Sequence, residues 1–79
     1  MAEIVGKYIV EVPAEWTSDM VPLIAADYQG IAEWFAKWWT WENFRIFKTA
    51  SKAGVYDAKT GKLLVGYVNG ERIRHLKVD

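Results

Sequence analysis

Apolar residues recur with two different periods along the chain, and each change of period marks a predicted element. Residues 4–12 alternate, with Tyr8, Val10 and Val12 on one face, which is typical of a strand. From residue 19 to about residue 40 the apolar positions instead recur every three or four residues, which predicts a helix. Alternation then returns and predicts four more strands, at residues 44–50, 55–57, 62–68 and 71–78.

These elements predict an α+β fold for a single domain over residues 1–79, in the order β-α-β-β-β-β. The simplest arrangement is one amphipathic helix packed on one face of a mostly antiparallel, twisted sheet. Asn69-Gly70 predicts a type I′ turn between the last two strands, because both residues tolerate positive φ. Gly61 suits the positive φ of the preceding hairpin, and the phase of Ile73 indicates a bulge near Arg74-His75.

The ends and the buried side of the helix follow from its residues. Asp19 is the expected N-cap and Pro22 lies in the expected first turn, while Asn43 is expected to end the helix in the left-handed conformation. The side that includes Glu33 and Ala36 is expected to face solvent. The opposite side is expected to be buried, and its residues are Ile24, Tyr28, Ile31, Phe35 and Trp38.

Four of the five tryptophans lie within eight residues, from Trp34 to Trp41, and Trp16 is expected to cover one edge of the core. A small core needs large side chains, so one interpretation buries all of them. The apolar arc is nevertheless wider than one sheet face requires. We therefore expect Trp34 or Trp41 to be largely exposed, where it binds a protein partner or pairs in a homodimer. The predicted partner-binding residues are Leu23, Asp27, Trp34, Lys37 and Trp41.

Charge is unevenly distributed although the net charge is zero. Residues 1–43 carry a net charge of −5 and residues 44–79 a net charge of +5. The two halves either attract each other across the fold or present an acidic and a basic face to partners. The absence of a membrane-length apolar run and of a signal-peptide pattern leads us to expect a cytoplasmic protein.

Catalytic and metal-binding patterns are missing from the sequence. The chain has no cysteine, one histidine (His75) and two serines (Ser18 and Ser51), and neither serine has the sequence context of an activated nucleophile. The scattered acidic residues show no zinc or calcium spacing, and the glycines form no phosphate-binding loop. We therefore expect a non-enzymatic protein without a metal or cofactor.

Two binding functions remain. The first is a protein-binding module that uses the Trp-rich helix, and small chains of this kind resemble in size and style the phage and mobile-element inhibitors that occlude a host protein, such as anti-CRISPR proteins and polymerase inhibitors. The second is a nucleic-acid-binding domain that uses a basic sheet with interleaved aromatic residues. A pI of about 6.6 argues against the second function, since such domains are usually basic. The basic residues concerned are Arg45, Lys48, Arg72, Arg74 and Lys77.

Overall fold

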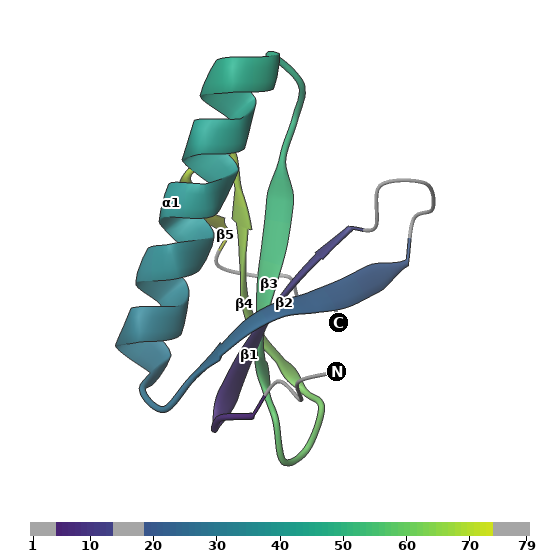
Figure 1. The fold of residues 1–79 in the computed structure, drawn as a ribbon, viewed down its shortest axis with the longest axis vertical. Coiled ribbons are helices and arrows are strands. Elements are labelled where there is room, and N and C mark those ends of the chain that lie inside the picture. The colour runs from purple at the N-terminus through teal and green to yellow at the C-terminus, as the bar shows by residue number, and fades with distance from the viewer. Residues whose placement is uncertain (1–4, 14–18, 74–79) are drawn as a thin grey trace.

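A computed structural model describes residues 5–13 and 19–73 of the chain (Figure 1). One helix, α1, follows two strands and precedes three others. The elements are β1 (Tyr8–Pro13), β2 (Met20–Ala26), α1 (Gln29–Phe47), β3 (Lys52–Asp57), β4 (Leu63–Val68) and β5 (Glu71–Ile73).

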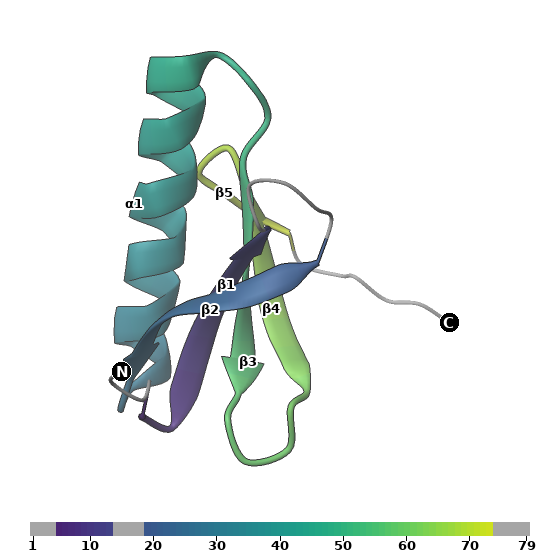
Figure 2. The same cartoon turned by 45° about the vertical axis from the view of Figure 1, so that its right-hand side comes forward.

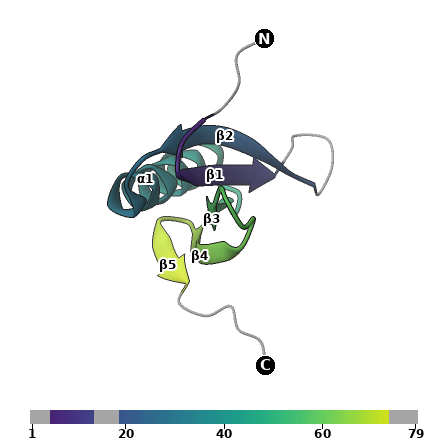
Figure 3. The ribbon, with the colours of Figure 1, turned by 90° about the horizontal axis from the view of Figure 1, so that it is seen from below.

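The five strands form one sheet in the order β2-β1-β3-β4-β5, and every neighbouring pair is antiparallel. Figure 3 shows the strands succeeding one another in this order. Figure 2 shows α1 as a second layer along one face of the sheet, where it contacts the central strand β3 more than any other strand. The predicted fold class is confirmed, although the helix follows the second strand of the chain rather than the first.

Residues 20–26 form a strand, so the prediction that they begin the helix is wrong. β2 pairs with β1, with Ile24 opposite Val10 and Ala26 opposite Tyr8. The pairing shifts register next to Pro22, and β2 lies at the edge of the sheet, where a residue without an N–H is tolerated. The apolar positions of this uncharged segment fit both the alternation of a strand and the three-to-four-residue repeat of a helix. Pairing with β1 decides in favour of the strand.

The helix also ends later than predicted. It continues to Phe47, and Lys48 takes the left-handed conformation (φ 61°) while donating its backbone N–H to the Phe44 carbonyl at 2.9 Å. Asn43 is not the cap: it lies inside the helix, and its side-chain amide donates to the Trp39 carbonyl at 2.9 Å. Residues 44–47 are therefore helical, and no strand covers residues 44–50 as was predicted.

The two turns that glycine was expected to permit are both present. Asn69 (φ 53°) and Gly70 (φ 86°) have the positive φ values that confirm the type I′ turn, here between β4 and β5. Gly61 has φ 75° in the loop between β3 and β4. The bulge predicted at Arg74-His75 and the position predicted for Trp16 lie outside the described residues.

Small side chains on α1 meet the sheet. Ala32, Ala36 and Thr40 are fully buried. The predicted orientation of the helix is therefore wrong, because Ala36 was expected to face solvent and Trp38 to be buried. Small side chains allow a helix axis to approach a sheet closely, whereas indoles would hold it away. The buried sheet residues that complete the core are Val10, Val12, Ala53, Val55, Val65 and Tyr67.

Three further residues of the predicted buried stripe are placed differently. Tyr28 and Ile31 are exposed, and Ile24 lies on β2, where it is partly buried against the core. Phe35 alone behaves nearly as expected, since it is a partly buried helix residue that packs against the core.

Candidate functional site

An apolar seam runs along the solvent side of α1. We call Ile31, Trp34, Trp38 and Trp41 the tryptophan seam. Solvent reaches 55% of Ile31, 63% of Trp34, 47% of Trp38 and 46% of Trp41. The expectation that Trp34 or Trp41 would be largely exposed is confirmed. The fourth tryptophan of α1, Trp39, is partly buried against the core.

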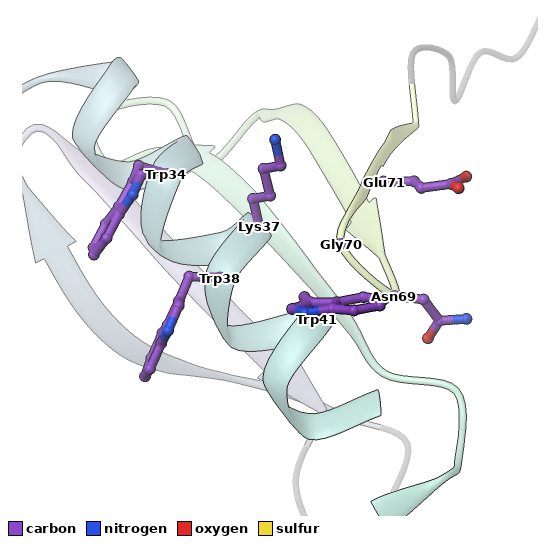
Figure 4. A pocket seen from close by; sticks show the side chains of 7 residues that line it. All are labelled: Trp34, Lys37, Trp38, Trp41, Asn69, Gly70 and Glu71. Carbon is purple, nitrogen blue, oxygen red and sulfur yellow. The ribbon is translucent and has the colours of Figure 1, made fainter. Parts of the chain in front are cut away.

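The indole rings of the seam have a defined geometry (Figure 4). The rings of Trp34 and Trp38 are parallel within 8°, with their centroids 6.4 Å apart. The Phe35 ring lies 5.8 Å from that of Trp38 at an angle of 53°. Trp41 instead lies toward the turn between β4 and β5. In the described part of the chain none of these indole N–H groups donates a hydrogen bond to protein, so their donors are open to solvent or a ligand.

A groove of about 500 Å³ lies between the seam and this turn. Its walls are mostly apolar, and its charged lining residues are Lys37 and Glu71. Figure 4 shows the Glu71 side chain extending away from the helix. Figure 4 shows the groove residues coming from two elements that are distant in sequence. They are Trp34, Lys37, Trp38, Trp41, Asn69, Gly70 and Glu71.

Hydrogen bonds and close packing fix the turn against the helix. The Gly70 N–H donates to Thr40 Oγ1 at 2.9 Å, and the Thr40 hydroxyl donates to the Ala36 carbonyl at 2.9 Å. Asn69 is held by Ser51, whose N–H donates to Asn69 Oδ1 at 2.8 Å. A Cβ on Gly70 would come within 2.9 Å of the Trp41 Cβ, so only glycine allows this approach. The groove is thus pre-formed, which lowers the entropic cost of binding.

A second set of polar contacts ties β4 and β5 to the first turns of α1. Glu33 Oε1 accepts hydrogen bonds from the Tyr67 hydroxyl at 2.9 Å and from Arg72 Nε at 3.1 Å. Glu33 Oε2 accepts one from the Gln29 amide at 2.8 Å. Burial alone would raise the pKa of Glu33, but the hydrogen bonds from Gln29 and Tyr67 and the charge of Arg72 lower it below its usual value. Burial and the bond to Glu33 raise the pKa of Tyr67.

Three of the five predicted partner-binding residues come together. Trp34, Lys37 and Trp41 all line the groove, whereas Leu23 lies on β2 and Asp27 in the bend that follows it. Neither Leu23 nor Asp27 borders the groove, because the segment expected to be helical is a strand. The sequence interpretation also placed Trp38 in the core, although its spacing from Trp34 and Trp41 puts it on their side.

The basic residues of the alternative function are partly neutralised. Arg45 pairs with Glu42 at 2.6 Å, and Arg72 pairs with Glu33. Lys48 is exposed beside the end of α1, while Arg74, Lys77 and His75 lie outside the described residues. Over residues 5–13 and 19–73, no group of three or more potential ligands could hold a metal ion.

No helix in the part of the chain that the structure describes has the length and apolar character needed to cross a membrane. Comparison with known proteins found no matching family model, curated protein or solved structure.

Proposed function

We propose that this chain is a non-enzymatic protein-binding module that holds its partner in the groove beside the tryptophan seam. One observation carries the proposal: three neighbouring tryptophans of one helix are about half exposed or more, next to a turn that is fixed in place. Tryptophan is the residue most enriched at the energetic centres of protein interfaces. Exposed indoles lower solubility, which favours a surface that a partner covers.

The groove has the general anatomy of such a centre. Its indoles supply apolar area, and Lys37 supplies a charged group beside them that can orient a partner. Burial of the exposed indole area contributes roughly 25 cal/mol per Å², and little is lost to ordering because Thr40 already holds the turn. A chain of this size acts most simply by occluding its partner's surface, as an inhibitor of a host protein does. We propose that it does so in the cytoplasm.

The nucleic-acid alternative has less support. The Arg45 and Arg72 guanidinium groups are engaged by Glu42 and Glu33, which reduces the charge that they offer to phosphates. Stacking on bases also needs exposed aromatic rings on the sheet, and Tyr67 of β4 is buried in the core.

Affinity capture from a lysate of the native host, followed by mass spectrometry, tests the proposed function. The baits are the wild-type chain, the double variant Trp34→Ala/Trp41→Ala and the control Ile46→Ala, in which an exposed apolar residue outside the groove is truncated. We expect one protein to be retained by the wild type and the control, at low and high salt, and to be lost with the double variant. Equal retention by the double variant would contradict the proposal. Capture that disappears at high salt, with nucleic acid in the eluate, would favour the alternative.

A further inference from the structure

The spacing of the tryptophan seam is that of a helix–helix interface. Ile31, Trp34, Trp38 and Trp41 follow one another at intervals of three, four and three residues. This is the a/d repeat by which one helix packs along another, and here it faces away from the protein's own sheet. The inner side of the helix is already satisfied by the sheet through Ala32 and Ala36. α1 is therefore built to contact two layers, and only one of them is present among the described residues.

We infer that the missing layer is α1 of a second copy, so that two chains pair through their tryptophan seams in a two-fold dimer. The dimer covers the groove, and on the basis of the proposed function it regulates that site: a partner gains access only when the two copies separate. Self-association then stores the protein in a form without exposed indoles.

The available area suits a weak dimer. The four seam residues expose on the order of 500 Å² per chain, taking up to ~250 Å² for each aromatic side chain. Two copies would then bury about 1,000 Å² of apolar surface, which is the lower bound for a specific interface. A contact of this size dissociates readily, as a regulatory dimer must.

The charges are compatible with a second copy. The residues that line the groove include one cation, Lys37, and one anion, Glu71. A two-fold axis places the same surface on both sides of the interface, so the cation of one chain can face the anion of the other. The chain has no net charge, so two copies do not repel each other over long range.

Sedimentation equilibrium of the purified chain, from about 1 to 500 µM, tests this inference. We expect the wild type to shift from monomer to dimer within the range. Trp34→Glu, which places a carboxylate in the seam, should weaken association at least tenfold. Ile46→Glu is the matched control. Ile46 is 55% exposed, a fraction similar to that of Trp34, but it lies about 100° around the helix from the centre of the seam. This variant should associate like the wild type. Far-UV circular dichroism checks that each variant is folded.

A charge exchange provides the second arm. Lys37→Glu should weaken the dimer about three- to tenfold, and the combination Lys37→Glu/Glu71→Lys should restore it. Wild-type protein that stays monomeric throughout the range would overturn the inference, and so would a dimer that Trp34→Glu leaves intact. Capture of a host protein by a chain that remains monomeric would leave the proposed function standing and the dimer excluded.

Discussion

The two sides of α1 carry side chains of very different size. Large apolar residues are usually expected on the buried side of a helix, but here the small residues are buried and the large ones are exposed. The inner side meets the sheet with Ala32, Ala36 and Thr40, while the outer side carries Trp34 and Trp38. A helix and a sheet pack at a distance set by the side chains between them, and alanines allow the closest approach. Trp34 and Trp38 therefore do not mark the core, although Phe35 and Trp39 of the same helix are partly buried against it.

The difference separates stability from function. The inner side belongs to a close-packed interior, where any added volume or charge must displace neighbours. The outer side is about half exposed; its contacts include the stacking of Trp34 on Trp38 and the approach of Trp41 to Gly70. Substitutions on the inner side of the helix should therefore mainly lower stability. Substitutions on the outer side should mainly weaken binding.

The largest expected effect comes from a charge on the inner side. Ala36→Glu would place a carboxylate at a fully buried position of the apolar core, at a cost of about 3–5 kcal/mol. The chain's total stability is expected to be on the order of 4–8 kcal/mol, so this variant should lose a large share of it and unfold at a much lower urea concentration than the wild type. Urea denaturation followed by circular dichroism measures the loss. Trp34→Glu is the matched variant on the outer side and should remain folded; equal loss in both variants would mean that the two sides are not distinct.

The next effect tests how closely the outer side approaches the turn. Gly70→Ala combines the strain of positive φ with a 2.9 Å approach of the new methyl group to the Trp41 Cβ, and should cost about 2–3 kcal/mol. Gly61→Ala is the control, since Gly61 has a similar φ of 75° but no atom within 4 Å of the new Cβ. It should cost only about 1–2 kcal/mol. The difference between the two melting curves isolates the contact with Trp41, and identical losses would show that the turn does not press on the helix.

Local patterns predicted only part of the sheet, and they predicted the helix boundaries poorly. Alternation identified β1 and β4, and Asn69-Gly70 identified the last hairpin, because both signals arise within a few residues. β2 was missed because its apolar residues and Pro22 also fit the first turn of a helix, and only pairing with β1 distinguishes the two. Residues 44–47 were assigned to a strand although the i, i+3 pair of Glu42 and Arg45 supports a helix there.

The candidate site was only partly accessible from sequence. An excess of tryptophan over what one sheet can cover correctly indicated exposure of Trp34 and Trp41. The wrong face was chosen for Trp38, since the prediction assumed that the stripe with the largest residues is buried. The turn that forms the other wall was recognised as a turn, but its position against Thr40 depends on tertiary contacts between residues 30 positions apart.

A smaller effect concerns the polar contacts at the edge of the inner side. The folded-state pKa of Glu33 lies below its usual value of 4.5, so the unfolded chain takes up this proton first as the pH falls. The resulting stability is present above pH ~4.5 and is lost as the pH drops through the lower folded-state pKa. The pair with Arg72 is partly exposed and contributes about 0–1 kcal/mol. Urea denaturation between pH 3 and 6 should show a steeper acid decline for the wild type than for Glu33→Gln; parallel declines would contradict the assignment.

The smallest effect is expected where the largest side chain is removed. Trp34→Ala gives up a ring contact with Trp38 worth about 0.5–1.5 kcal/mol, but alanine has a helix propensity roughly 0.5 kcal/mol better than tryptophan. The net change in unfolding free energy should therefore stay within about 1 kcal/mol. This is far less than the cost expected for Ala36→Glu on the inner side of the same helix. Iodide quenching of the wild type at low concentration provides an independent measurement, since exposed indoles are quenched and buried ones are not. A loss of more than 2 kcal/mol in Trp34→Ala, or the absence of quenchable tryptophan in a monomeric sample, would place the seam in the interior and remove the distinction between the two sides of the helix.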